Sequence, residues 1–260
     1  MGYVEIFLEK HTRGRQYHTY EKDLHLPENL FDGDMDILVI GGGEGVYDFP
    51  YKLQTANRIT NIDLFVPPAA CDHSINSIQG DFMSAEFRPD SFDEIWALWS
   101  LPLYCPTSEA ARIFFAKGCL FLKPGGKFRI LPITLRDESA GLMRGAIKRN
   151  VHSSGIFRNL YHCMHQFVKI GGKIDIRQCA DLAGGTTESS QVFDAALFRK
   201  FMDVKFTDEI PIGLTSAIIT KPENSSAAIN QKLQEDISHL NKTAVYPGII
   251  AHIDNQKIRY

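Results

Sequence analysis

A glycine cluster after an apolar segment is the feature of this sequence that points most directly to chemistry. Residues 40–45 read Ile-Gly-Gly-Gly-Glu-Gly and follow directly on the apolar run DILVI. Glycines at such a junction let the backbone turn sharply and let a ligand approach without an intervening Cβ. The spacing is G-x-G-x-G, through Gly41, Gly43 and Gly45. A dinucleotide fingerprint would need glycine at Val46, and no Gly-Lys-Ser/Thr of a phosphate-binding loop follows.

Two carboxylates follow apolar segments further along the chain. Asp63 ends the segment RITNID, 18 residues after Gly45 (63 minus 45). A carboxylate there can accept hydrogen bonds from both hydroxyls of a ribose, which favours an unphosphorylated adenosine. Asp81 follows Gly80 and can accept from an exocyclic amine, and Phe82 offers an apolar face for a purine. A lone aspartate after a strand is more often a turn or capping residue, so its position beside the glycine cluster is what indicates a nucleoside site.

Alternating strands and helices must bring these residues to one edge of a sheet. The apolar runs predict strands at residues 36–40, 58–64, 77–79, 92–99 and 127–135. The segments between them predict a helix over 108–122 and another within 46–56. The latter should begin near residues 47 to 49, because Pro50 is tolerated only in a first turn. This alternation is typical of a parallel α/β sheet.

The alternation breaks down after residue 135. The remaining predicted parts are a helical cap inserted over the carboxyl edge of the sheet at 136–192, a helix at 193–202, strands at 204–210 and 215–220, and a C-terminal helix and tail within 223–260. The core then spans about residues 30–135 and 193–222. All 260 residues are predicted to form a single domain.

Composition and charge argue against several other classes of protein. The formal net charge of −3 gives no electrostatic attraction to nucleic acid or to an anionic membrane. No apolar stretch approaches the roughly 18 residues that span a bilayer, and the first residues lack the apolar region of a secretory signal. The five cysteines are odd in number and form no C-x-x-C pair, which favours reduced thiols. We therefore expect a cytoplasmic protein with no nucleic-acid or membrane partner.

His162, Cys163 and His165 come nearest to a metal-binding pattern. On a helix the two histidines share a face, but no carboxylate or third ligand stands at a usual spacing, so no metal site is expected. Packing or surface exposure is the commoner role for such a group. Its functional alternatives are substrate binding, or a general base near neutral pH.

Five ordered motifs resemble those of the class I S-adenosylmethionine-dependent methyltransferase superfamily: DILVIGGGEG, NIDLF, QGDFMS, FDEIWALWSLPLY and LKPGGKFRI. The resemblance is strong over about residues 36–135 and looser over 204–220. It implies a Rossmann-like, seven-stranded sheet with its last strand antiparallel and helices on both faces. It also implies that S-adenosylmethionine lies across the carboxyl ends of the first strands, near Gly41, Gly43, Glu44, Gly45, Asp63, Leu64, Asp81, Phe82 and Trp99.

The function that this resemblance implies is transfer of a methyl group to an acceptor. We expect a small-molecule acceptor, and a protein acceptor stays open. The acceptor's nucleophile would attack the methyl carbon in line with the departing sulfur, while the protein supplies alignment and excludes water. Such a transfer needs no obligatory catalytic side chain when the nucleophile is already deprotonated, so no catalytic residue is predicted.

Two features of the glycine cluster leave alternatives open. The family commonly has an acidic residue two positions before the first glycine, where this chain has Val39, so Glu44 or a cap residue would have to help hold the cofactor's amino group. This departure keeps a non-catalytic, methyltransferase-like binding module as an alternative. The GGGEG form is also similar to the loop of spermidine synthases, but residues 99–104 contain none of the carboxylates with which those enzymes grip a polyamine. Aminopropyl transfer is the more distant alternative.

Overall fold

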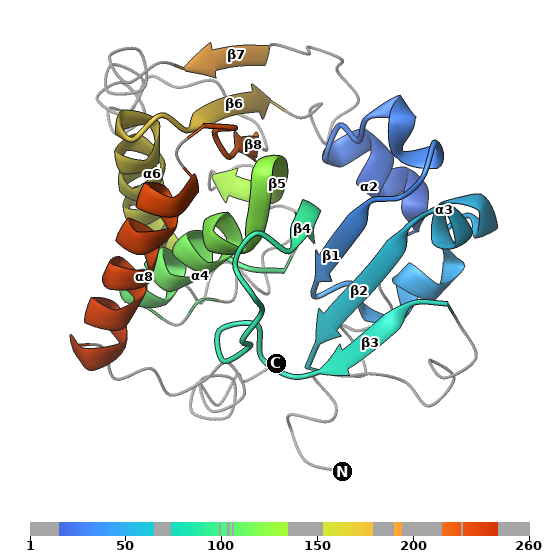
Figure 1. Ribbon diagram of the computed structural model, residues 1–260, viewed down its shortest axis with the longest axis horizontal. Coiled ribbons are helices and arrows are strands. Elements are labelled where there is room, and N and C mark those ends of the chain that lie inside the picture. Colours follow the sequence, from blue (N-terminus) through green and yellow to red (C-terminus); the bar gives the residue numbers. More distant parts are fainter. Residues whose placement is uncertain are drawn as a thin grey trace.

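An eight-stranded mixed sheet runs through the molecule (Figure 1). The structure is a computed structural model, and it describes residues 16–64, 74–98, 100–102, 105, 107–134, 153–178, 190–193, 215–224 and 226–243. The strand order is β3-β2-β1-β4-β5-β8-β6-β7. The strands are β1 (Asp36–Ile40), β2 (Arg58–Asp63), β3 (Asn76–Gln79), β4 (Phe92–Leu98), β5 (Leu122–Thr134), β6 (Lys173–Gln178), β7 (Ser190–Phe193) and β8 (Thr215–Thr220).

The strand directions confirm the predicted Rossmann-like arrangement. Strands β1 to β5 run parallel to one another, and β8 lies antiparallel between β5 and β6. The last strand in the sequence therefore runs antiparallel to β1–β5, as expected. The sheet has eight strands and not seven, because Ser190–Phe193 pairs antiparallel with β6 as an additional edge strand.

Helices cover both faces of this sheet (Figure 1). They are α2 (Tyr17–Asp23), η1 (Glu28–Phe31), η2 (Gly43–Asp48) and α3 (Tyr51–Ala56) on one face, and α4 (Ser108–Phe121), α6 (Ser153–Lys169) and α8 (Ser226–Thr243) on the other. Alternate residues of a strand point to opposite faces. Thus Ile37 and Val39 join the first group of helices, while Leu38 and Ile40 join the second. No helix in the described ranges combines the length and apolar character needed to cross a membrane.

Pro50 divides the helix that was expected after the glycine cluster. The segment Gly43–Asp48 forms the 3₁₀ helix η2, and α3 begins only at Tyr51. Proline has no amide hydrogen and disfavours a helical conformation in the residue before it, and Phe49 is accordingly extended at ψ 147°. The prediction of one helix starting near residues 47 to 49 is therefore wrong.

The segment expected to form a cap contributes in part to the sheet itself. Residues 153–169 form α6, which packs on α4 through the rings of Phe115 and Phe167, 5.8 Å apart. Residues 173–178 form β6, and its alternate residues Ile174 and Ile176 are buried. The predicted extent of the cap therefore differs from the structure over these residues. The remaining cap segments and the strand predicted at 204–210 lie outside the described residues.

A buried ion pair ties the amino-terminal segment to the sheet. Arg129 of β5 and Glu94 of β4 meet at 2.8 Å, with side chains 3% and 5% exposed. The Trp96 indole also donates to the Glu94 carboxylate. Arg129 further donates to the carbonyl oxygens of Leu24 and His25 at 3.0 and 2.6 Å. One guanidinium therefore joins two strands to the segment that follows α2.

Lys221 makes a comparable junction at the end of β8. Its side chain is fully buried, and its ammonium donates to Asp90, just before β4, and to Asn230 of α8, at 2.7 and 2.6 Å. It also donates to the carbonyl oxygen of Leu122 at 2.8 Å. Because a buried charge is tolerated only when it is well partnered, this cluster fixes α8 against the sheet.

Candidate functional site

The glycine loop between β1 and η2 is held by the neighbouring strand β2. Three consecutive loop amides donate to β2: Gly41 N to Ile62 O at 2.8 Å, Gly42 N to the Asn61 Oδ1 at 3.3 Å, and Gly43 N to the Asp63 Oδ2 at 2.8 Å. Asn61 and Asp63 are two residues apart, so their side chains lie on the same face of the strand. The loop therefore has a defined shape that the protein itself maintains.

Close packing within the protein explains two of the three glycines at positions 41 to 43. Gly41 has φ +67°, and a Cβ there would lie 2.5 Å from the Cβ of Ser100. Ser100 is buried beyond the end of β4, and its hydroxyl donates to Ile40 O at 2.7 Å. At Gly42 a Cβ would lie 2.3 Å from a methyl group of Val46. From the sequence, the glycine cluster was expected to allow the approach of a ligand. Contacts inside the protein already require glycine at positions 41 and 42.

The carboxyl ends of β2 and β3 bring Asp63, Gly80 and Asp81 to one edge. The Gly80 amide donates to Asp63 O at 2.8 Å, and a Cβ on Gly80 would meet no atom within 4 Å. The space over Gly80 is thus open, next to the strand end that carries Asp63. Asp81 accepts from the Met83 amide at 2.8 Å, so its carboxylate caps the turn that follows. The rim thus combines open space over Gly80 with the carboxylates of Asp63 and Asp81.

The structure does not support the role predicted for Phe82. Its side chain is only 3% exposed, and its ring packs edge-on against Phe114 and Phe121 at centroid distances of 5.9 and 6.1 Å. A ring enclosed by other rings in this way cannot offer a face to a purine. Phe82 is a core residue under α4, and its neighbours Phe114 and Phe121 stand more than 30 residues further along the chain, outside the local motif.

The other predicted site residues occupy three kinds of environment. Gly45 is buried within η2, and Glu44 of the same helix is exposed. Leu64 is partly buried and packs against the larger core cluster. Trp99 lies outside the described residues. The structure therefore brings the glycine loop close to Asp63 and places Asp81 on the next strand end.

Lys117 positions the turn that begins at Asp81, and the sequence analysis missed it. From α4 its ammonium donates to Met83 O at 2.6 Å and to Ala85 O at 2.7 Å. Burial lowers the pKa of Lys117, and the charges of Glu86 and Asp81 oppose that shift. A lysine on the apolar face of a helix was the available signal, since such a residue must find buried acceptors.

Asn61 was missed as well, although it stands in the middle of an apolar strand. Its side chain is fully buried, and its Oδ1 accepts from Gly42. Its Nδ2 is buried and has no hydrogen-bond partner among the described residues. A buried donor left unsatisfied costs about 1–3 kcal/mol. The signal in the sequence was an amide side chain at a position where the strand pattern requires an apolar one.

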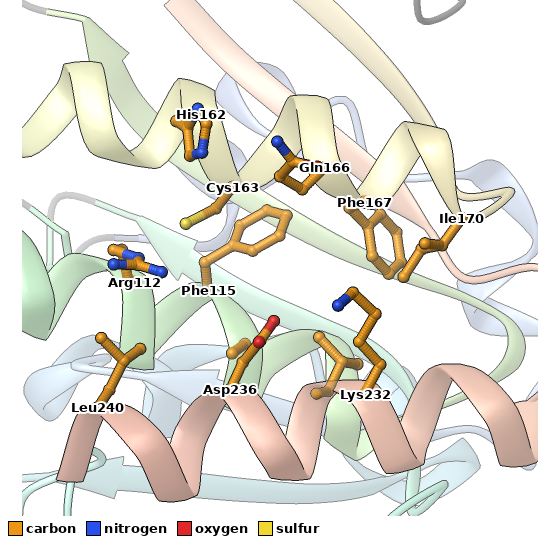
Figure 2. Close-up of a pocket in the computed structure, with 12 residues that line it drawn as sticks. Arg112, Phe115, His162, Cys163, Gln166, Phe167, Ile170, Lys232, Asp236 and Leu240 are labelled. Atoms are coloured by element: carbon orange, nitrogen blue, oxygen red, sulfur yellow. The ribbon is translucent and has the colours of Figure 1, made fainter. Parts of the chain in front are cut away.

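His162 and Cys163 line a different pocket, of about 180 Å³, between α4, α6 and α8 (Figure 2). None of the residues lining it comes from the glycine loop or β2. His162 is exposed, and burial raises the pKa of the Cys163 thiol to about 11. Burial therefore keeps Cys163 largely in its thiol form near pH 7 and makes it a weak nucleophile. Among the described residues, no three side chains of the metal-binding types gather in one place.

Comparison with known proteins gives one distant curated relative. No protein-family model matches the chain. The sterol 24-C-methyltransferase of Candida albicans is 25% identical over 135 residues, which cover 48% of this chain. The match spans only 33% of the length of that relative.

Solved structures are similar only at a distance. A SAM-dependent methyltransferase from Archaeoglobus fulgidus is 18% identical with a TM-score of 0.48, over 85% of this chain and all of that one. The phosphoethanolamine N-methyltransferase 1 of Haemonchus contortus is 14% identical with a TM-score of 0.45, over 92% of this chain and 54% of that one. Both TM-scores lie below 0.5. The parallel strands β1–β5 and the antiparallel last strand β8 agree with the sheet that the resemblance to class I methyltransferases implies.

Proposed function

We propose that this chain is an S-adenosylmethionine-dependent methyltransferase whose acceptor is a small molecule. The observation that carries the proposal is the glycine loop, held by β2 next to Asp63 at the carboxyl edge of parallel strands. Ligands of open α/β sheets bind at this edge. The curated relative with a matching 135-residue segment is a methyltransferase, which supports the same reaction class.

The residues present fit the adenosine part of this cofactor. Asp63 would accept hydrogen bonds from the ribose hydroxyls, and its bond to Gly43 fixes the orientation of its carboxylate. Open space over Gly80 leaves room beside it, and Asp81 would accept from the adenine amine. Exposed Glu44 would help to hold the amino group, because Val39 is apolar and fully buried.

When bound, S-adenosylmethionine supplies a methyl group on a positively charged sulfur, which makes the methyl carbon electrophilic. The chain's own part is to bind, orient and exclude water. The Ser100–Gly41 contact sets the distance between the end of β4 and the loop, and so shapes the edge at which the acceptor would meet the methyl group. No proton-transfer residue is assigned.

Calorimetric titration with S-adenosylmethionine and S-adenosylhomocysteine tests the proposal. We expect the wild-type chain to bind both ligands with micromolar Kd values, and we expect these values to rise at least tenfold in Asp63→Ala. Asp48→Ala, an exposed residue at the far end of η2, is the control and should bind like wild type. If folded wild-type protein bound neither ligand, the proposal would be wrong.

The same titration, followed by a screen for methyl transfer, distinguishes the proposal from its alternatives. Tight binding without methyl transfer to any acceptor in a broad screen favours the non-catalytic binding module. Preference for the decarboxylated cofactor favours aminopropyl transfer, for which the described residues 100–102 beyond β4 supply no carboxylate. A protein acceptor and the cytoplasmic location stay predictions, which labelled methyl transfer in a cell extract and fractionation would test.

A further inference from the structure

Two buried asparagines, Asn57 and Asn61, stand four residues apart, and their side chains differ in the number of hydrogen bonds that they make. Asn57 lies between α3 and β2, and Asn61 lies within β2. Asn57 is 7% exposed and makes three hydrogen bonds. Its Oδ1 accepts from the Met35 amide at 3.1 Å, and its Nδ2 donates to the carbonyl oxygens of Leu30 and Leu53 at 2.8 and 3.0 Å. Asn57 therefore stabilises the fold, because it satisfies backbone groups of three separate segments.

Asn61 contributes much less to the fold. It is less exposed than Asn57, yet the one hydrogen bond of its side chain to a described residue is from the Gly42 amide, at 3.3 Å. Its Nδ2 has no partner within the described ranges. An unsatisfied buried donor destabilises a folded protein, and an apolar residue of the same size would remove that cost. A residue that costs stability in this way is expected where function requires it.

Asn61 accepts the middle one of the three hydrogen bonds by which β2 holds the glycine loop, and we call these three bonds the clamp. Gly41 is held by a backbone oxygen of β2, and Gly43 by Asp63. Gly42 lies between them, and its only acceptor from β2 is the Asn61 amide oxygen. Without that acceptor the loop would be fixed at its two ends and free to rotate the peptide between them.

The packing around Gly42 shows why the acceptor comes from β2. A Cβ on Gly42 would lie 2.8 Å from the Asn61 Oδ1 and 2.8 Å from a methyl group of Val39. Val39 and Asn61 are register partners on adjacent parallel strands, so their side chains lie next to each other on one face. Strand β1 offers only a methyl group here, and the polar atom that faces the loop belongs to its neighbour.

We propose that Asn61 is a positioning residue, retained to hold the glycine loop in the shape that the nucleoside cofactor requires and not to stabilise the fold. The inference rests on the proposed function for the identity of the ligand. The three hydrogen bonds from the loop amides to β2 do not depend on the proposed function, because they are formed within the protein itself.

Asn61→Leu and Asn57→Leu form a matched pair that tests this role. For Asn61→Leu we expect a melting temperature within about 3 °C of wild type, because the lost bond and the removed unsatisfied donor offset each other. We expect its Kd for S-adenosylhomocysteine to rise at least tenfold, and the Gly42 amide to exchange with solvent at least tenfold faster. For Asn57→Leu we expect a melting temperature at least about 6 °C lower and a Kd within threefold of wild type. Asn57→Ser replaces it if the leucine variant does not fold.

The outcomes separate this inference from the proposed function. If Asn61→Leu loses as much stability as the Asn57 variant, Asn61 is a structural residue and the inference is wrong. The inference also fails if wild type binds and Asn61→Leu binds equally well. If wild type binds no S-adenosyl ligand, the proposed function fails, and exchange at Gly42 in the free protein decides: faster exchange at unchanged stability supports the positioning role, and unchanged exchange overturns it.

Discussion

The Asp63 carboxylate accepts a hydrogen bond from the backbone amide of Gly43 at 2.8 Å, so the residue expected to hold a ribose already holds the loop. The two tasks can be separated, because Asp63→Asn keeps a carbonyl oxygen for the loop and removes the charge. Hydrogen bonds to charged groups contribute about 1.5–3 kcal/mol, against about 1 for neutral ones. We expect Asp63→Asn to weaken S-adenosylhomocysteine binding about five- to tenfold, and Asp63→Ala to weaken it further. Equal affinities of the two variants in calorimetry would contradict a separate role for the loop contact.

Because Gly41 and Ser100 lie in contact, the effects of substitutions at these two positions on the free energy of unfolding should not be additive. Gly41→Ala adds a Cβ 2.5 Å from that of Ser100, at a backbone φ of +67°. Overpacking costs about 1–3 kcal/mol and the left-handed conformation about 1–2 more. In the double variant with Ser100→Gly the overlap is gone and the strained φ remains. In urea denaturation, the free energy of unfolding of the double variant should therefore be at least about 1 kcal/mol higher than the sum of the two single-variant changes predicts. Strict additivity of the two changes would disprove the steric explanation.

Breaking the buried ion pair between Glu94 and Arg129 should be costly. Glu94→Gln keeps the shape of the side chain but leaves the guanidinium buried without its counter-charge. Such a change costs about 3–5 kcal/mol. Amide exchange over residues 16–26 should also rise, since Arg129 holds the carbonyl oxygens of Leu24 and His25.

The control for that variant is a solvent-exposed ion pair. Asp34 pairs with Arg58 at 2.7 Å, with side chains 90% and 61% exposed. Asp34→Asn should change the free energy of unfolding by less than about 0.5 kcal/mol. Similar losses for Glu94→Gln and Asp34→Asn would mean that burial does not decide the strength of these pairs.

Acid should weaken one cluster at the start of β1. Hydrogen bonds from Arg58, followed by those from Lys123, lower the pKa of Asp36 from 3.8 to about 2. Because the folded pKa lies below the unfolded one, this contribution is complete above about pH 4 and is lost as the pH falls towards 2. Solvent screening limits it to about 1 kcal/mol. The stability gap between wild type and Asp36→Asn should shrink between pH 5 and pH 2.5, and a constant gap would contradict the assignment.

Cys163 should react slowly with alkylating agents. Burial raises the pKa of its thiol from 9.0 to about 11, and only the thiolate is nucleophilic. In a variant with Cys71→Ser and Cys179→Ser, iodoacetamide should modify the folded protein at pH 7.5 at least about a hundredfold more slowly than a free thiol. The rate should rise about tenfold per pH unit up to pH 9.5. Fast, pH-independent modification of Cys163 would show that its surroundings differ from those described.

The strands of the first half were predictable because each carries its own signal. Strands β1, β2 and β4 are apolar runs buried on both faces, and turn residues bound them. Strand β6 was missed, because its alternation of Ile174 and Ile176 with polar residues is short and its partner β8 lies about 40 residues away. Pairing of that kind is a long-range property, and a local pattern does not encode it.

The glycines of the site and Asp63 were predictable from the sequence, whereas the roles of the buried residues around them were not. Whether Phe82 faces a ligand or the core depends on Phe114 and Phe121 of α4, which approach it only in the folded chain. Lys117 and Asn61 each stood out as a polar residue in an apolar pattern. Their acceptors and donors lie at least 19 residues away, so their roles were visible only in three dimensions.

The Lys221 cluster has a consequence for how the chain is made. The ammonium joins Asp90, which leaves the ribosome early, to Asn230, which is among the last described residues to be synthesised. Until Asn230 has emerged, a nascent chain that closed β8 onto β5 would bury a charge without one of its partners. Closure of this half of the sheet is therefore complete only when α8 has formed. A chain terminated at residue 224 would keep the bonds from Lys221 to Asp90, Leu120 and Leu122, but it would lose the Asn230 acceptor that links the sheet to α8.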